Sequence, residues 1–256
     1  MTRIPTAFLS HGAPTLALDA TSGADFARWG ATLPSPRAVL VVSAHWQRAP
    51  ATIGTATQRE LLYDFHGFPP ELYRMRYDAP AAAQLADELQ QRIPGIARDD
   101  RRPWDHGVWV PLLHVFPQAD VPVLQLSLPS AGPAADLLEL GRRLAPLRDE
   151  GVLLLGSGGA VHNLGGLDWR GTAPPPAWAT EFEAWLRERV AARAFDDLAD
   201  WRALAPGAAL AHPTPEHYLP LLVVAGAAID DPDPPRFPIE GFEFGSLSRL
   251  AIEFGA

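Results

Sequence analysis

Continuous apolar runs alternate along the chain with stretches in which apolar residues recur at helical spacing. Short, nearly continuous apolar runs are typical of strands that a sheet buries on both faces. Four runs have this pattern: residues 6–10 (TAFLS), 38–44 (AVLVVSA), 121–128 (VPVLQLSL) and 151–158 (GVLLLGSG). Three segments have the helical pattern: residues 81–93, 134–147 and 175–190. The alternation of strands and helices predicts an α/β protein.

The sequence predicts one domain rather than several. It contains no internal repeat and no segment with the composition of a linker. Its 256 residues, 47% of them hydrophobic, are enough to bury one large core. We therefore expect a single domain over residues 1–256, in which helices flank a central sheet and residues 241–254 add one or two closing strands.

Net charge and cysteine content exclude several classes of function. The formal charge of −9 and the pI near 5.3 argue against nucleic acid or a membrane as a partner, because both attract clusters of Lys and Arg. The absence of cysteine excludes disulfides, thiolate metal sites and a cysteine nucleophile. No signal-peptide core or bilayer-spanning run is visible, so we expect a soluble cytoplasmic protein. Any metal must then be held by His, Asp or Glu.

Three of the eight histidines lie at or just past the end of a predicted strand: His11, His45 and His162. The carboxyl edge of an α/β sheet is where ligands bind. A single histidine in such a place is more often bonded to a loop carbonyl. Three histidines at equivalent places favour one shared binding site.

Two more histidines, His212 and His217, lie in the segment HPTPEHY. Thr214 and Pro215 have the pattern of an N-cap and a first helical residue, so we expect a helix over residues 216–228 with His217 in its first turn. The positive end of the helix dipole favours a neutral, metal-binding imidazole. Helical spacing would turn His212 about 140° away from His217. His217 is the better candidate ligand, and His212 is expected to support the site, to face substrate or to bond a loop.

The remaining histidines lie in two aromatic segments, WDHGVWVPLLHVF and YDFHGFPPELYRMRY. His106 opens a short apolar helix, where Asp105 is positioned to orient it. His114 lies among apolar residues and is expected in the core. His66 has aromatic neighbours in a loop and is a weaker candidate for lining a pocket.

A metal centre suits these residues better than the other chemistries that the sequence offers. Three neutral imidazoles with open coordination positions suit Zn²⁺ or Fe²⁺. Ser157 lies in GSGGA, which is not the G-x-S-x-G elbow of serine hydrolases. The same glycines lack the lysine and spacing of a phosphate loop, and the H-E-x-x-H motif of zinc proteases is absent. We expect a metal site with a further, non-ligand histidine for proton transfer.

Six ordered motifs resemble the DOPA 4,5-dioxygenase-like branch of the class III extradiol ring-cleavage dioxygenases. They are FLSHGAP, VVSAHWQ, YDFHGFPPELY, DHGVWVPL, GSGGAVHNL and HPTPEHYLPLL, and they extend from about residue 7 to residue 228. The resemblance implies a single α/β domain with a central mixed, largely parallel sheet. It also implies one divalent non-haem metal per chain and O₂-dependent opening of a catechol ring to a semialdehyde.

The resemblance also implies roles for individual histidines. His11 of SHG and His45 of SAHW correspond to metal ligands. His217 takes the place of a glutamate that opens a helix in the wider superfamily. His162 of VHNL corresponds to the catalytic acid–base, and His106 of DHG to a residue that helps bind substrate or oxygen.

The implied partners are a small catechol and O₂, with a monomer or small homo-oligomer as the expected assembly. Trp46, Phe65 and Tyr218 are candidate contacts for the catechol ring, although such residues are as often packed in a core. His66 and His212 complete the set of residues expected to contact substrate or to support the site.

The metal and the reaction have alternatives at this level. A set of three histidines departs from the two-His-one-carboxylate triad of Fe²⁺ oxygenases and is also a ligand set of catalytic zinc. We expect Fe²⁺ to support activity and Zn²⁺ to bind the same site. The alternatives are a zinc-dependent hydrolase on this scaffold, in which His162 activates a water, and a non-catalytic metal-binding protein.

Overall fold

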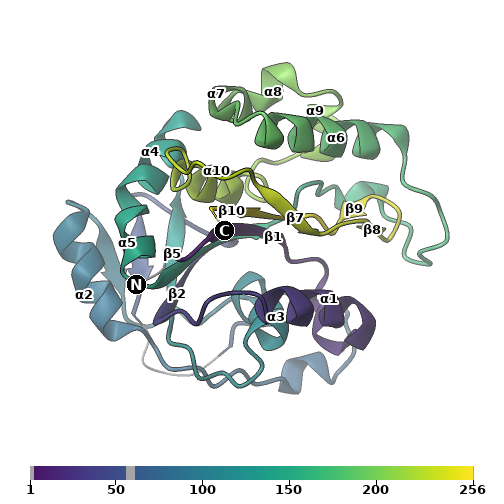
Figure 1. Cartoon of the computed structure of the whole chain (residues 1–256). Helices are drawn as coiled ribbons and strands as arrows, with labels where there is room; N and C mark the ends of the chain where they lie inside the picture. The colour runs from purple at the N-terminus through teal and green to yellow at the C-terminus, as the bar shows by residue number, and fades with distance from the viewer. Residues whose placement is uncertain (1–2, 56–60, 256) are drawn as a thin grey trace.

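The computed structural model describes residues 3–55 and 61–255 (Figure 1). Its strands are β1 (Thr6–Ser10), β2 (Ala38–Arg48), β3 (Thr52–Gly54), β4 (Ala97–Asp99), β5 (Val123–Pro129), β6 (Val152–Gly158), β7 (Arg236–Ile239), β8 (Phe242–Glu243), β9 (Leu247–Ser248) and β10 (Ala251–Phe254). Its α-helices are α1 (Ala20–Gly30), α2 (Ala83–Arg92), α3 (His106–Val115), α4 (Ala135–Leu144), α5 (Pro146–Asp149), α6 (Ala177–Ala191), α7 (Phe195–Ala199), α8 (Trp201–Leu204), α9 (Ala208–Ala211) and α10 (Leu219–Gly226). Short 3-10 helices are η1 (Pro14–Leu18), η2 (Leu72–Arg74) and η3 (Leu164–Gly166).

The described strands form an eight-stranded sheet in the order β4-β3-β5-β2-β6-β1-β10-β7, and β8 and β9 form a separate hairpin. The central strands β5, β2, β6 and β1 are parallel to their neighbours in this group. β10 pairs antiparallel to β1, and β3 pairs antiparallel to β5. The expected single α/β domain with a mixed, largely parallel sheet is therefore confirmed.

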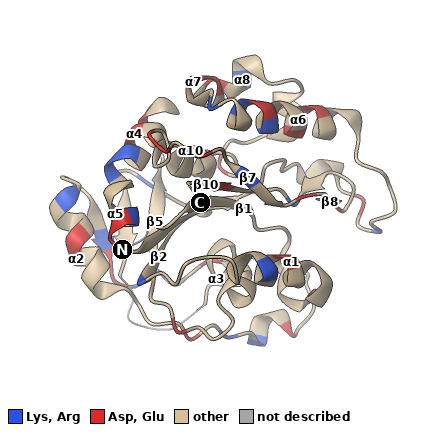
Figure 2. Ribbon diagram, in the orientation of Figure 1, with Lys and Arg blue, Asp and Glu red and all other residues tan. Residues whose placement is uncertain are grey.

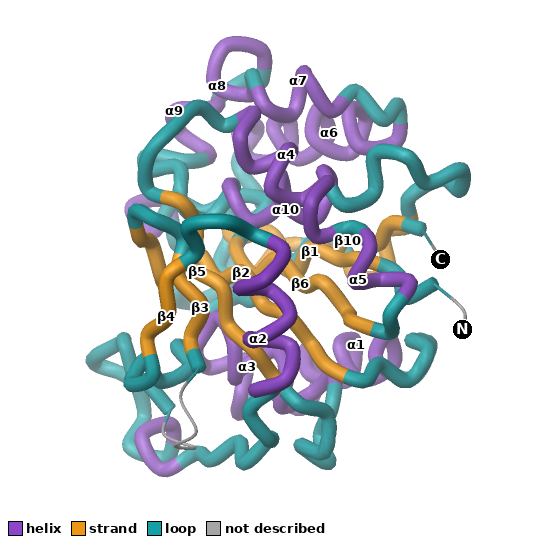
Figure 3. The backbone as a smooth tube through the Cα atoms, turned by 90° about the vertical axis from the view of Figure 1, so that its left-hand side faces the viewer, coloured by secondary structure: helices purple, strands orange, loops and turns teal. Residues whose placement is uncertain are grey.

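Helices cover both faces of this sheet (Figures 1 and 3). On one face, Leu40 and Val42 of β2 belong to a core cluster that includes α2, α4, α6 and α10. On the other face, Val39 and Val41 belong to a cluster that includes α1 and α3. Successive side chains of a strand point to opposite faces, so a continuous apolar run fills two cores at once.

Charged side chains lie mainly on the outer helices and loops, while β1 and β5 carry none (Figure 2). Among the described residues, no helix combines the length and the apolar character that crossing a membrane requires.

The glycines of β6 let α10 approach the sheet closely. A Cβ atom at Gly156 would lie 2.6 Å from the carbonyl oxygen of Pro220, and one at Gly158 would lie 2.1 Å from that of His217. Real Cβ atoms essentially never come this close to another heavy atom. The glycine-rich motif therefore serves helix packing, and it sets His217 directly beside the end of β6.

Three local expectations need correction. Residues 241–254 form three short strands, β8, β9 and β10, rather than one or two, and β8 and β9 pair apart from the main sheet. The other two corrections concern site residues. β2 continues past residue 44, and its pairing with β5 shifts register between Ser43 and Gln47, so His45 lies in an irregular part of the strand rather than after it. Irregularities of this kind redirect side chains near active sites. The helix predicted over residues 216–228 begins only at Leu219.

The later start of α10 has a physical cause in the turn before it. Thr214 donates its hydroxyl hydrogen bond to Glu216 Oε1 (2.7 Å) instead of capping a helix. The His217 carbonyl accepts the N–H of Gly159 (2.9 Å), so a contact with the end of β6 fixes this turn. His217 consequently lies just before the helix rather than in its first turn.

Candidate metal and catalytic site

Six of the eight histidines line one cavity of about 310 Å³ at the carboxyl edge of the central strands: His11, His45, His66, His106, His162 and His217. Aromatic and aliphatic side chains form much of the remaining wall, including Phe65, Phe68 and Trp169. The cavity thus combines a polar floor with apolar sides, as is typical of small-molecule sites.

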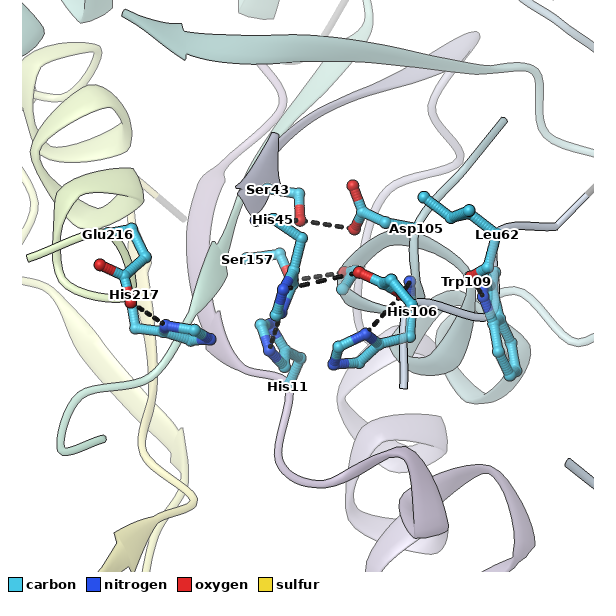
Figure 4. Close-up of polar contacts among 12 residues, drawn as sticks. His11, Ser43, His45, Leu62, Asp105, His106, Trp109, Ser157, Glu216 and His217 are labelled. Carbon is cyan, nitrogen blue, oxygen red and sulfur yellow. Dashed lines mark hydrogen bonds and ion pairs between the residues drawn. The ribbon is translucent and has the colours of Figure 1, made fainter. Parts of the chain in front are cut away.

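His11, His45 and His217 each offer a ring nitrogen, and the three nitrogen atoms lie within 4.8 Å of one another (Figure 4). His11 comes from the end of β1, His45 from the irregular part of β2, and His217 from the turn before α10. The Nε2 atoms of His11 and His45 are 3.1 Å apart. Two imidazole nitrogens at this distance need a shared proton or a cation between them, because their lone pairs repel each other.

The hydrogen bonds around His11 fix which of its nitrogens is free. Ser157 donates its hydroxyl hydrogen to the carbonyl oxygen of Gly107, so its oxygen is left to accept. His11 Nδ1 lies 2.9 Å from that oxygen and therefore carries the proton. The Nε2 lone pair of His11 then faces His45, in the form that binds a metal.

His217 shows the same arrangement with a carboxylate in place of the hydroxyl. Its Nδ1 lies 3.3 Å from Glu216 Oε1, which can only accept a hydrogen bond when ionised. Its Nε2 is buried and has no hydrogen-bond partner among the described residues. An unpaired buried nitrogen is costly, and a bound cation would satisfy it. The donor set therefore fits a divalent metal such as Zn²⁺ or Fe²⁺.

Burial keeps these imidazoles neutral. It lowers the pKa of His11 and of His217 well below the ordinary value, and the neighbouring imidazoles lower both further. Burial and His106 also lower the pKa of His45 to about 4. A metal binds only the neutral form, so at neutral pH protons compete weakly for these ligands.

His162 lies directly against His217, with ring centroids 3.4 Å apart and planes 5° from parallel. Burial lowers the pKa of His162 to about 4, so its ring is also neutral. His106 opens α3, and its ring centroid lies 4.1 Å from that of His45. Both histidines are next to the three candidate ligands without belonging to their set.

Asp64 is a cavity residue that the sequence analysis did not identify. Its Oδ1 accepts from His106 Nδ1 (2.8 Å), whereas Asp105 was expected to orient this ring. That expectation is wrong, because Asp105 is buried and accepts instead from Ser43, Arg102 and Gln125.

Asp64 also belongs to a second group that has metal-ligating potential, together with His45 and His106. Burial raises the pKa of the Asp64 carboxyl, but the hydrogen bond and the charge of His106 outweigh this and lower it to about 2. The sequence gives no signal for these pairings, because the partners are far apart along the chain.

Three of the suggested substrate contacts lie in the core and not in the cavity wall. Trp46 is buried in β2, and Tyr218 is buried with its hydroxyl bonded to the carbonyl of Leu198 (3.0 Å). His212 is enclosed by aromatic rings and bonds the carbonyl of Ala160 through Nε2 (3.0 Å). Trp46 and Tyr218 are therefore core residues, which is the other role that the sequence allowed for them, and His212 bonds a loop carbonyl, which is one of its three expected roles.

Phe65 and His66 do line the cavity. The Phe65 ring meets His106 edge-on, with centroids 5.7 Å apart. His66 is exposed at the rim of the cavity.

Residues 5–255 match the family model described as the catalytic LigB subunit of aromatic ring-opening dioxygenase. The chain belongs to this family. It is 40% identical to the 4,5-DOPA dioxygenase extradiol of Escherichia coli (strain K12), over 99% of this chain and 96% of that protein. The Beta vulgaris protein of the same name is 39% identical, over 87% and 86% of the two chains. The solved structure of an uncharacterized E. coli K12 protein has a TM-score of 0.84 and 37% identity, covering 99% of this chain and all of that one.

These matches make the chain an extradiol ring-cleavage dioxygenase of a metal-dependent family. They agree with the resemblance drawn from the six sequence motifs. They give no support to the zinc-hydrolase alternative.

The dioxygenase offers a direct test of which histidine of the HPTPEHY segment binds metal. We expect His217→Ala to lose most of its bound metal, because it removes the unpaired Nε2 from the ligand group. His212→Asn should keep its metal, because its bond to Ala160 lies outside the cavity. Metal content by mass spectrometry after loading and desalting gives the comparison. Equal metal loss in both variants, or loss in His212→Asn alone, would contradict the assignment.

Metal-free dioxygenase should lose stability as the pH falls below about 6.5. The pKa values of His45 and His162 are about 4 in the folded chain, against an ordinary value of 6.5. The unfolded chain therefore binds more protons between these values, which lowers the free energy of unfolding by up to roughly 1.4 kcal/mol per pH unit and histidine. Urea unfolding in the presence of a chelator at about pH 7, 6 and 5 measures this slope.

His162→Gln is the matched control for that slope, since it removes one of the rings whose pKa is lowered in the folded chain. Its stability should depend less on pH than that of the unaltered chain. A free energy of unfolding that is constant between pH 7 and 5 would contradict the explanation.

Proposed function

We propose that this chain is an Fe²⁺-dependent extradiol dioxygenase that opens the ring of a DOPA-like catechol with O₂ to form a semialdehyde. The observation that carries the proposal is the arrangement of six histidines around one cavity, with an unpaired Nε2 on His217. Membership of the ring-opening family and the names of the E. coli and Beta vulgaris relatives support the reaction and the DOPA-like substrate.

In the proposed site, His11, His45 and His217 hold the metal. Their nitrogens meet within 4.8 Å, and the bonds to Ser157 and Glu216 leave Nε2 free on two of them. When bound, the metal supplies a Lewis-acidic, redox-active centre at which catechol and O₂ meet. Fe²⁺ is proposed for turnover because the four-electron reduction of O₂ is outside the chemistry of Zn²⁺, which has no redox activity.

His162 is the proposed acid–base. Its imidazole is neutral at pH 7 because burial lowers its pKa to about 4, so its lone pair is available to accept a proton from a catechol hydroxyl. His106, on the other side of His45, is proposed to bind substrate or oxygen. Its Nδ1–H is donated to Asp64, so in the neutral ring Nε2 is the nitrogen that can accept a hydrogen bond.

The apolar wall positions the aromatic ring and limits the access of water. Phe65 and Phe68 lie edge-to-face beside the histidines, with centroids 5.5 Å apart. Leu164 and Trp169 form the outer part of the wall, where each is 61% exposed without substrate. A bound catechol would cover part of this apolar surface, which favours binding.

The reaction adds both atoms of O₂ to the ring. The carbon–carbon bond beside the two hydroxylated carbons breaks, and each oxygen atom ends in the semialdehyde product. The ring supplies the four electrons that reduce O₂, so no external reductant is consumed. His162 returns its proton to the product, which leaves the protein unchanged.

Metal-free protein reloaded under anaerobic conditions tests the proposal. With Fe²⁺, we expect a catechol panel that includes DOPA to give one O₂ consumed per catechol and a new visible absorbance. Zn²⁺-loaded protein should give neither signal, because Zn²⁺ cannot exchange electrons with O₂. An oxygen electrode and a spectrophotometer measure both quantities. The proposal fails when Fe²⁺ is bound and no catechol leads to oxygen uptake.

His162→Ala should separate metal binding from proton transfer. We expect the variant to retain its metal and to lose about 10²- to 10⁴-fold in kcat, the usual contribution of a positioned acid–base. His114→Gln is the control, since His114 bonds the carbonyl of Leu16 away from this cavity and a glutamine can keep that bond. Loss of metal from His162→Ala would instead make His162 a ligand.

A further inference from the structure

Asp64 is the one carboxylate among the described residues that line the cavity. It lies between two of the histidines. Oδ1 is 2.8 Å from His106 Nδ1 and 3.1 Å from the His106 backbone nitrogen, while Oδ2 is 3.6 Å from His45 Nδ1. One side chain therefore contacts a candidate metal ligand and a candidate substrate-binding residue.

The loop that carries Asp64 is held in place by bonds that do not involve its carboxylate. The Leu62 N–H donates to the carbonyl of Trp104 (2.8 Å), and the Trp109 indole donates to the carbonyl of Leu62 (3.3 Å). Tyr63 donates its hydroxyl hydrogen bond to the carbonyl of Met75 (2.9 Å). Removing the carboxylate should therefore leave the loop in place.

No other acidic side chain takes the place of Asp64 at the start of α3. Asp105 precedes the helix but makes no capping bond with its side chain. Its carboxylate is buried with Ser43 (2.6 Å) and Arg102 (3.2 Å) as partners. The free N–H at the first residue of the helix is satisfied by Asp64 from 42 positions away in the chain.

We propose that Asp64 is a positioning residue that fixes the ring orientation and the tautomer of His106. The proposal rests on the proposed function, because it names what holds His106 ready for the ring-opening reaction. An ionised carboxylate can only accept, so Asp64 holds the Nδ1 proton of His106 in place, and in the neutral ring Nε2 is then the unprotonated nitrogen. The same oxygen accepts the backbone N–H of His106, which ties the ring to the helix start.

A carboxylate behind a histidine is a common way of orienting an imidazole, and its loss typically costs about 10- to 100-fold in affinity or activity. Without Asp64, His106 can rotate and can place its proton on either nitrogen. Only those protein molecules in which His106 Nε2 is unprotonated and points toward the substrate would then accept a hydrogen bond from it. At saturating metal the expected effect is on kcat, because the three nitrogen atoms of the ligand group are all still present.

The competing role for Asp64 is that of a metal ligand, because it forms a second potential group with His45 and His106. The two roles predict different metal contents for a variant that lacks the Asp64 carboxylate. A positioning residue can be removed while the metal remains, whereas a ligand cannot.

The test compares Asp64→Ala and Asp64→Asn with the unaltered chain at saturating Fe²⁺. We expect about one metal per chain in all three, a kcat about 10- to 100-fold lower for Asp64→Ala, and a KM for catechol changed by less than about threefold. Asp64→Asn keeps an oxygen that can accept from His106 and should recover part of the kcat. Asp87→Asn is the control, since Asp87 pairs with Arg98 on the surface.

A second readout is independent of activity. In Zn²⁺-loaded, ¹⁵N-histidine-labelled protein, the His106 Nε2 resonance should have the shift of an unprotonated nitrogen, and His106→Gln identifies it. In Asp64→Ala this resonance should move toward the average of two tautomers. A loss of stability alone would leave the tautomer in the folded protein unchanged.

The outcomes separate this inference from the proposed function. An unchanged kcat and an unchanged His106 resonance in Asp64→Ala would overturn the positioning role, and loss of metal would make Asp64 a ligand. If the unaltered chain consumes no O₂ with any catechol, the proposed function fails, while the resonance still tests whether Asp64 sets the tautomer.

Discussion

The close contact between β6 and the turn before α10 is the constraint on which the site depends. Gly158 leaves no room for a side chain beside the His217 carbonyl, and that carbonyl accepts the Gly159 N–H. The contact delivers His217 to the same sheet edge as His11 and His45, although His217 comes from the turn before α10 and not from a strand. A larger residue at Gly158 would displace the turn, and the histidine would leave the cluster. The glycines that let the turn before α10 pack against β6 therefore also determine the position of His217 in the site.

Burying His11, His45, His162 and His217 together is possible because each of these four imidazoles stays neutral. Burial is the main cause of the lowered pKa values of His11, His45 and His217, because a protonated ring would lose its solvation by water, and the neighbouring histidines lower these values further. Neutral rings still have unpaired nitrogens, as His217 Nε2 shows. The site thus has a free-energy cost in the absence of a cation, and this cost favours the binding of one.

Much of the sheet was predictable because a strand is a local pattern, and β1 and β6 begin and end within one residue of their predicted bounds. The shared cavity of His11, His45 and His162 followed from the rule that parallel strands end at one edge. The start of α10 could not be predicted from the local sequence, because a hydrogen bond to Gly159 overrides the capping pattern at Thr214. Asp64 was missed for a similar reason, because its pairing with His106 spans 42 residues and has no local signal.

The distribution of charge around the histidines explains how a neutral ligand set can serve a divalent cation. A two-His-one-carboxylate triad places its negative charge on the metal itself. Here the negative charges belong to carboxylates beside the ring nitrogens that face away from the metal position. Glu216 lies 3.3 Å from His217 Nδ1, and Asp64 lies 3.6 Å from His45 Nδ1. Carboxylates in this position orient an imidazole and raise its basicity. A cation bound by the three rings would therefore be offset by two carboxylates that lie one imidazole away.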